Sequence, residues 1–118
     1  MSKGWIGVDL DGTLAHYDKW RGETHVGEPV VPMVDRVRRW LAAGHEVRIF
    51  TARVSEPNER DRAKITECIQ AWAERHIGAR LAVTCVKDYA MSELFDDRAV
   101  QVEANTGRLV GYSRRGLE

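Results

Sequence analysis

The sequence predicts an α/β fold with a mainly parallel sheet, arranged as a three-layer α/β/α sandwich. Short apolar runs typical of buried strands alternate with longer segments in which apolar residues recur at helical spacing. This alternation favours parallel strands joined by right-handed crossover helices. The chain has 118 residues, of which 43% are hydrophobic and 31% charged. We therefore expect residues 1–118 to form a single globular domain with its own hydrophobic core.

The first part of the chain predicts a strand, a long loop and a helix. Residues 5–9 are mainly apolar and are expected to form a buried strand. Residues 15–31 are polar, aromatic and interrupted by glycines, which favours a loop or a short hairpin. Pro32 suits the first turn of the helix that follows, and Gly44 is expected to end it. The apolar residues at helical spacing in this helix are Val34, Val37 and Leu41.

A second strand and a second helix follow. Residues 46–50 form the predicted strand, which ends at Thr51, and residues 52–58 are expected to be a loop. Asn58 is a candidate N-cap for a helix that runs to about His76. The apolar residues on one side of this helix are Ile65, Ile69, Trp72, Ala73 and Ile77.

Further strand candidates complete the chain. Residues 81–86 form a predicted third strand, and residues 93–95 a short fourth strand that two aspartates follow at once. Residues 99–102 and 108–112 are later candidates, joined through the turn residues 105–107. Strands therefore alternate with helices as far as the predicted third strand.

Charged and hydroxyl side chains come directly after several of the predicted strands. Two aspartates flank the end of the first strand, a threonine follows the second, a lysine the third and an acidic pair the fourth. Open α/β sheets bind their ligands beyond the carboxyl ends of their strands, so we expect these residues to share one functional edge. The residues concerned are Asp9, Asp11, Thr51, Lys87, Asp96 and Asp97.

A cluster of carboxylates beside a hydroxyl and a lysine suits phosphoryl transfer. Crowded carboxylates repel one another and lose hydration, so they usually serve a cation, a substrate or a shared proton. Hard carboxylate oxygens without soft ligands favour Mg²⁺. One carboxylate can be the nucleophile, and a lysine can neutralise charge on the transferring group. Arg53 follows Thr51 by two positions, and contact to phosphate, contact to a substrate carboxylate and a surface ion pair are its alternatives.

The overall charge and the cysteines limit the kinds of partner that we expect. Lys and Arg total 18 and Asp and Glu total 18, so a nucleic-acid partner stays open but is not indicated by the zero net charge. Cys68 and Cys85 lie on different predicted elements, so neither a disulfide nor a zinc site is expected. The first residues do not resemble a signal peptide, and no apolar run is long enough to span a membrane. We expect a cytoplasmic protein without a membrane partner.

Four motifs in order resemble those of the haloacid dehalogenase (HAD) superfamily of phosphohydrolases. The stretch DLDGTL at residues 9–14 is similar to the first motif of the family, and the strand that ends at Thr51 is similar to the second. Lys87 is the best-placed counterpart of the lysine in the third motif, and the acidic pair at residues 96–97 is similar to the fourth. The resemblance spans residues 6–97 and implies a HAD-like, Rossmannoid fold.

The resemblance implies a role for each matching residue. Asp9 would attack phosphorus and form an aspartyl-phosphate, and Asp11 would act as general acid and then as general base. Lys87 would hold a phosphate oxygen, with Lys64 as a competitor for this role. The Mg²⁺ ligands would be Asp9, Asp11 through its backbone carbonyl, Asp96 and Asp97. The groups around the phosphate would be Thr51, Lys87 and the backbone N–H groups of Leu10 and Ala52, with Arg53 as an additional candidate.

The spacing of the motifs leaves no room for the cap domain that many HAD relatives carry. Predicted elements take up much of the chain from Thr13 to Thr51 and from Thr51 to Lys87. The chain therefore resembles a minimal, capless phosphatase for a phosphomonoester, whose open site a large substrate or a second copy of the chain would cover. Tyr17 and Trp20 either contact the leaving group or pack within their own loop. The alternatives are a nucleic-acid end-processing 3′-phosphatase and a phosphate- or nucleotide-binding module without turnover.

Overall fold

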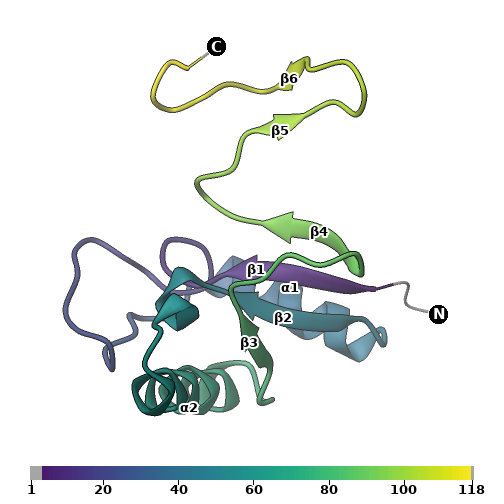
Figure 1. Cartoon of the computed structure of the whole chain (residues 1–118). Coiled ribbons are helices and arrows are strands. Elements are labelled where there is room, and N and C mark those ends of the chain that lie inside the picture. Colours follow the sequence, from purple (N-terminus) through teal and green to yellow (C-terminus); the bar gives the residue numbers. More distant parts are fainter. Residues whose placement is uncertain (1–3, 118) are drawn as a thin grey trace.

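Four parallel strands form the main sheet of the molecule. The computed structural model describes residues 4–117 of the chain, and Figure 1 shows how its elements are arranged. The strand order is β3-β2-β1-β4, and every pairing in this sheet is parallel. The predicted α/β fold with a parallel sheet is thereby confirmed. The strands are β1 (Trp5–Asp9), β2 (Glu46–Phe50), β3 (Ala82–Thr84) and β4 (Met91–Phe95).

Two α-helices connect the first three strands. α1 (Val31–Ala42) joins β1 to β2, and α2 (Glu59–His76) joins β2 to β3. Pro32 lies in the first turn of α1, where a helix does not need the N–H that proline lacks. Asn58 caps α2, since its side chain accepts a hydrogen bond from the Asp61 N–H at 3.0 Å. Of the helices in the described part of the chain, none combines the length and hydropathy of a membrane span.

Replacing Asn58 with alanine is expected to lower the free energy of unfolding by about 1 kcal/mol, because the first turn of α2 loses its cap. Urea denaturation of the purified protein measures this change. Asn58→Ser is the matched control, since a hydroxyl oxygen accepts the same hydrogen bond and should restore most of the stability. Equal losses for the two variants would show that the cap does not hold this helix.

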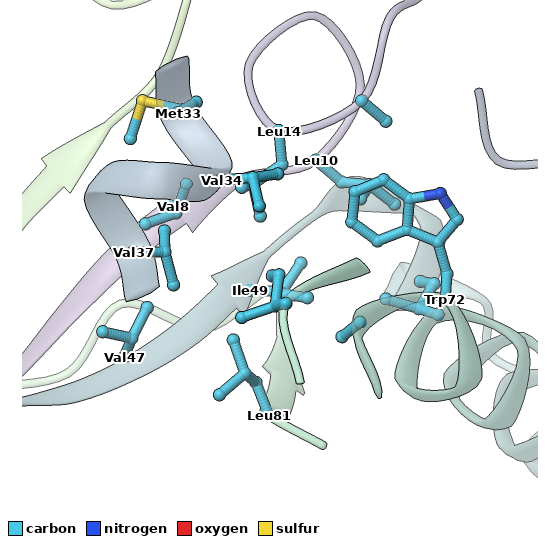
Figure 2. Packing of buried hydrophobic residues seen from close by; sticks show 14 of the residues in the cluster. Val8, Leu10, Leu14, Met33, Val34, Val37, Val47, Ile49, Trp72 and Leu81 are labelled. Carbon is cyan, nitrogen blue, oxygen red and sulfur yellow. The ribbon is translucent and has the colours of Figure 1, made fainter. Parts of the chain in front are cut away.

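Both helices pack against the same face of the sheet. Strand residues that share a face alternate along the chain, and Ile6, Val8, Val47 and Ile49 are all buried in one hydrophobic cluster. Figure 2 shows Val8, Val47 and Ile49 beside side chains from both helices. The helix residues in the cluster include Met33, Val34, Val37, Ile65, Ile69 and Trp72.

The opposite face of the sheet carries no helix in residues 4–117. Trp5 lies on this face, since it alternates with the core residues of β1, and it is fully buried. Its indole N–H donates to Asp88 at 2.8 Å, and the Arg48 guanidinium lies 4.5 Å from its ring centroid. Residues 85–90 alone connect β3 to β4, too few for a crossover helix. On this face, where the predicted sandwich has its third layer, the short connection contacts Trp5 through Asp88.

Several element boundaries differ from the predicted ones. β3 stops at Thr84, because the Thr84 hydroxyl accepts a hydrogen bond from the Val86 N–H at 3.0 Å and turns the chain. β4 begins at Met91, earlier than the sequence pattern indicates. Residues 52–58, predicted as a loop, contain η1 (Ala52–Ser55), a 3-10 helix too short to have a periodic signal.

Residues 98–117, called the C-terminal arm below, lie outside the four-stranded sheet (Figure 1). β5 (Gln101–Val102) pairs with β6 (Leu109–Val110) in a separate antiparallel sheet. Asn105 and Gly107 turn the chain between them with φ values of 65° and 78°. Both predicted late strands are present, but each has only two residues.

Candidate functional site

The turn after β1 lets side chains crowd together at the carboxyl edge of the sheet. The N–H groups of Leu14 and Ala15 both donate to the carbonyl oxygen of Leu10, at 3.0 and 2.9 Å. Gly12 lies in this turn with a φ of 91°, which glycine adopts without strain. A Cβ on Gly12 would lie 2.7 Å from Asp97 Oδ2. Glycine is therefore needed both for the turn and for the approach of Asp97.

Asp9, Asp96 and Asp97 form a cluster, called the acidic triad below. Each offers a carboxylate oxygen, and these oxygens all lie within 4.8 Å of one another. The hydroxyl of Thr13 lies 3.1 Å from Asp97 Oδ1 and 3.4 Å from Asp9 Oδ2. The Thr13 hydroxyl oxygen also accepts a hydrogen bond from the Asp97 N–H at 3.1 Å. Oxygen atoms grouped in this way suit a hard divalent cation such as Mg²⁺.

The carboxyl group of Asp9 is difficult to ionise in these surroundings. The pKa of Asp9 is raised from 3.8 to about 7, first by burial and then by the hydrogen bond with Asp97. The charges of Asp96 and Asp97 raise the pKa further, whereas the Leu10 backbone hydrogen bond lowers it. A cation among these oxygens would reverse the shift, because it favours the charged form. Among residues 4–117, no ion pair includes a carboxylate of the acidic triad.

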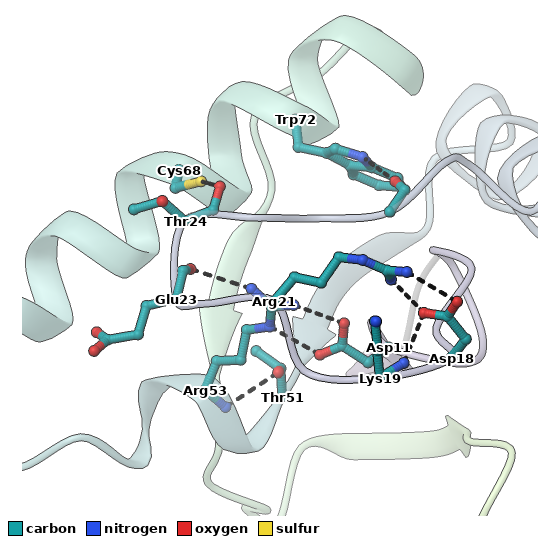
Figure 3. Close-up of polar contacts among 11 residues, drawn as sticks. Asp11, Asp18, Lys19, Arg21, Glu23, Thr24, Thr51, Arg53, Cys68 and Trp72 are labelled. Carbon is teal, nitrogen blue, oxygen red and sulfur yellow. Dashed lines mark hydrogen bonds and ion pairs between the residues drawn. The ribbon is translucent and has the colours of Figure 1, made fainter.

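Asp11 is held by Arg53, as Figure 3 shows. Arg53 Nη2 donates to Asp11 Oδ1 and Arg53 Nε to Asp11 Oδ2, each at 2.8 Å. The Arg53 side chain is only 7% exposed. Its Nη1 donates to the Glu23 carbonyl oxygen at 3.1 Å, and the Trp20 ring centroid lies 4.9 Å from its Cζ. Among the alternatives for Arg53, the structure shows an ion pair, and a bidentate, largely buried one.

Thr51 lies at the end of β2 with its side chain buried. Its N–H donates to the Thr84 carbonyl oxygen at 2.8 Å, which continues the strand pairing by one residue. Its hydroxyl oxygen accepts a hydrogen bond from the Arg53 N–H at 3.2 Å and so begins η1. No described residue accepts the hydroxyl hydrogen. Thr51 therefore keeps one donor for a ligand oxygen.

Residues 16–28, called the flap below, are anchored to α2 (Figure 3). The Trp72 indole N–H donates to the Gly27 carbonyl oxygen at 2.9 Å. The Cys68 thiol donates to the Thr24 carbonyl oxygen at 3.0 Å. Since α2 packs in the hydrophobic core, these bonds tie the base of the flap to the core.

A cavity of about 450 Å³ lies beside these groups. Its size is that of a site for a small ligand. From the flap, Tyr17 and Trp20 line it, and these residues are 40% and 54% exposed. Phe50 and Arg98 also contribute to the lining. The predicted site residues that the structure brings together here are Asp9, Asp11, Thr51, Ala52, Arg53, Asp96 and Asp97.

Other predicted site residues lie elsewhere, and one cation was missed. Lys87 is exposed on the connection between β3 and β4 and does not line the cavity, and Lys64 is exposed on α2. The Leu10 side chain is buried in the core, so only its backbone reaches the site, where it bonds to the Asp9 carboxyl group. Arg98 lines the cavity instead of a lysine. Its position directly after Asp97 was the available sequence signal.

No protein-family model, curated protein or solved structure matches the chain. The chemistry of the cavity is therefore the basis for assigning a function. Three half-buried carboxylates, a buried hydroxyl and a clamped arginine meet at one edge of a parallel sheet. Such a set of groups can bind a divalent cation together with a phosphate.

Proposed function

We propose that the chain is a Mg²⁺-dependent phosphatase that hydrolyses a phosphomonoester through an aspartyl-phosphate on Asp9. In this proposal it is a minimal member of the HAD superfamily, with a HAD-like fold and without a cap domain. The observation that carries the proposal is the meeting of the acidic triad, Thr51 and Arg53 in one cavity. The order of the first, second and fourth sequence motifs supports the same conclusion, whereas Lys87 of the third lies outside the cavity.

The acidic triad is the proposed Mg²⁺ site, with the backbone carbonyl of Asp11 as a further ligand. Carboxylate oxygens within 4.8 Å of one another are close enough to share one ion. The ion, when bound, neutralises charge on the phosphoryl oxygens. It also favours the ionised form of Asp9, whose pKa is otherwise raised to about 7. Occupation of the site would therefore increase the fraction of Asp9 that is a nucleophilic carboxylate at neutral pH.

Asp9 and Asp11 have different tasks in the proposed reaction. A carboxylate oxygen of Asp9 forms a bond to phosphorus while the bond from phosphorus to the leaving oxygen breaks. Asp11, which takes up a proton from solvent once Arg53 releases it, gives that proton to the leaving oxygen. A water molecule then attacks the phosphorus of the aspartyl-phosphate, gives its proton to Asp11 and releases Asp9 with inorganic phosphate. The Thr51 hydroxyl and the Ala52 N–H are the proposed donors to the phosphate oxygens.

The ion pair of Asp11 with Arg53 represents the site without substrate. Arg53 engages both carboxylate oxygens of Asp11, so neither oxygen is available to a leaving group. Phosphate binds guanidinium groups through the same paired N–H donors, so a substrate competes with Asp11 for Arg53. Binding of substrate thereby releases Asp11 for acid catalysis. Arg53 thus exchanges Asp11 for the phosphate, and the released Asp11 acts as the general acid.

Replacing Arg53 with glutamine is expected to raise the KM for an aryl phosphate about tenfold, because the phosphate loses a charged bidentate donor. Steady-state kinetics with saturating Mg²⁺ measures this effect. Arg21→Gln is the matched control, since Arg21 pairs with Asp18 on the exposed part of the flap. Both variants lose one ion pair with an aspartate, but only Arg53 lines the cavity. An unchanged KM for Arg53→Gln would mean that Arg53 only braces the flap.

A phosphate- or nucleotide-binding module without turnover is the second candidate. The observation that favours it is the bidentate ion pair of Arg53 with Asp11, because both oxygens of the proposed general acid are already hydrogen-bonded. Incubation with a generic aryl phosphate and Mg²⁺ separates the two functions. Continuous release of phosphate, lost when EDTA removes the metal, is expected of the phosphatase. Tight binding of inorganic phosphate with no release across a broad set of phosphomonoesters would favour the binding module.

A further inference from the structure

A second groove adjoins the cavity that holds the acidic triad. Its volume is about 560 Å³, and it shares Asp97 and Arg98 with that cavity. The rest of its lining comes from the C-terminal arm, which Figure 1 shows beyond the edge of the sheet next to β4. These arm residues are Ala99, Val100, Tyr112, Ser113, Arg114, Arg115 and Leu117. A ligand in the cavity therefore has a path along the arm.

The C-terminal arm is strongly basic although the whole chain has no net charge. Residues 98–117 include four arginines but a single acidic residue, a glutamate. One of these arginines is paired with that glutamate and does not line the groove. Arg98, Arg114 and Arg115 do line it, and their guanidinium groups form no hydrogen bond or ion pair with any residue from 4 to 117. Three cations are thus available to an anionic ligand.

An exposed aromatic ring lies among these arginines. Tyr112 is 84% exposed although it lines the groove, and Leu117 is 63% exposed. Aromatic rings beside arginines are the usual surface on which single-stranded nucleic acids stack their bases, while the arginines follow the phosphates. A small phosphorylated metabolite would fit within the cavity of about 450 Å³ and would not use the groove. The groove therefore indicates a longer, repeatedly charged ligand.

We infer that the groove binds a single-stranded nucleic acid whose terminal phosphomonoester enters the acidic-triad cavity. Arg98 lies at the junction, Arg114 and Arg115 contact the phosphates that follow, and Tyr112 stacks on a base. The inference rests on the proposed phosphatase and names its substrate class. The zero net charge of the chain does not oppose it, because binding depends on the local charge along the groove.

Kinetics with substrates of increasing length tests the inference. We expect kcat/KM for an oligonucleotide with a terminal 3′- or 5′-phosphate to exceed that for the matching mononucleotide at least about tenfold. Combined Arg114→Gln and Arg115→Gln substitutions are expected to abolish this preference and to leave hydrolysis of an aryl phosphate unchanged. Arg108→Gln is the matched control, since Arg108 lies on the arm but pairs with Glu103.

Fluorescence anisotropy with a labelled, terminally phosphorylated oligonucleotide tests binding without relying on turnover. Loss of two phosphate contacts should reduce the slope of log affinity against log salt by about 1.4 in the double variant. Tyr112→Ala should weaken binding about tenfold. Hydrolysis of aryl phosphate without any preference for length, or binding that does not depend on Arg114 and Arg115, would overturn the inference alone. Arginine-dependent binding without any hydrolysis would instead overturn the proposed phosphatase and leave the groove assignment standing.

Discussion

Replacing Asp9 with asparagine is expected to lower the turnover of an aryl phosphate at least about a thousandfold, because an amide cannot form the acyl-phosphate. Asparagine has nearly the same shape as aspartate, so the turn after β1 and the hydrogen bond from the Leu10 backbone should persist. The same substitution is expected to make the metal-free protein more stable at neutral and alkaline pH. This combination separates loss of the nucleophile from loss of the fold.

The gain in stability follows from the raised pKa of Asp9. The pKa is about 7 in the folded protein and 3.8 for the ordinary group, so the folded state binds more protons between these values. The free energy of unfolding therefore falls as the pH rises from about 4 to about 7. Above that range Asp9 destabilises the metal-free protein by about 1–2 kcal/mol, a value discounted for partial exposure to solvent. Asparagine has no charge and removes this contribution.

Urea denaturation of wild-type protein and Asp9→Asn in EDTA, at about pH 5 and about pH 8, measures the change in stability. We expect the variant to be more stable than the wild type mainly at the higher pH. Asp35→Asn is the control, since Asp35 is exposed on α1. If the free energy of unfolding of Asp9→Asn depended on pH in the same way as that of the wild type, the electrostatic account of the acidic triad would be contradicted.

Removal of Mg²⁺ is expected to abolish turnover and to lower the melting temperature. At a Mg²⁺ concentration about a hundredfold above its Kd, binding stabilises the folded state by about 2.7 kcal/mol. For a chain of this length, that corresponds to a shift in melting temperature on the order of 10 °C. Thermal denaturation with and without EDTA measures the shift.

Asp96→Asn tests whether the acidic triad is where the metal binds. The amide keeps an oxygen for the hydrogen bond that Asp96 Oδ1 accepts from the Arg98 N–H at 2.7 Å, so the local turn should survive. The variant should lose most of the Mg²⁺-dependent shift in melting temperature. Asp61→Asn, on the exposed first turn of α2, should keep the full shift. A full shift in Asp96→Asn would place the metal elsewhere.

Much of the fold could be predicted because its signals are local. Buried strands such as β1 are short apolar runs, and the ends of α2 are marked by Asn58 and by Gly78, whose φ is 95°. The covering of the second sheet face was not predictable in this way. It depends on contacts of Trp5 with Arg48 and Asp88, residues that lie far apart in the sequence.

In the candidate site, too, some features follow from local sequence signals and others depend on long-range contacts. Asp9, Asp96 and Thr51 meet because each lies at the carboxyl end of a parallel strand, which the sequence pattern indicates. The partner of Arg53 depends on how the flap folds back, and no local pattern encodes that. The position of Lys87 depends on the connection between β3 and β4, where the neighbouring residue is tied by its side chain to the indole of Trp5. Such long-range bonds are set by tertiary packing and not by spacing.

Mass spectrometry of the acid-quenched protein tests the central claim, that Asp9 is the nucleophile, most directly. Asp11→Asn mixed with Mg²⁺ and 4-nitrophenyl phosphate should accumulate the intermediate. The 4-nitrophenolate leaving group of this substrate departs without an acid, so the aspartyl-phosphate still forms in the variant. Hydrolysis of the aspartyl-phosphate needs a base, which Asp11→Asn has lost. We predict a mass increase of one phosphoryl group on the peptide that contains Asp9. Release of 4-nitrophenol by the wild type, with no phosphoryl group on Asp9 in either protein, would contradict the account.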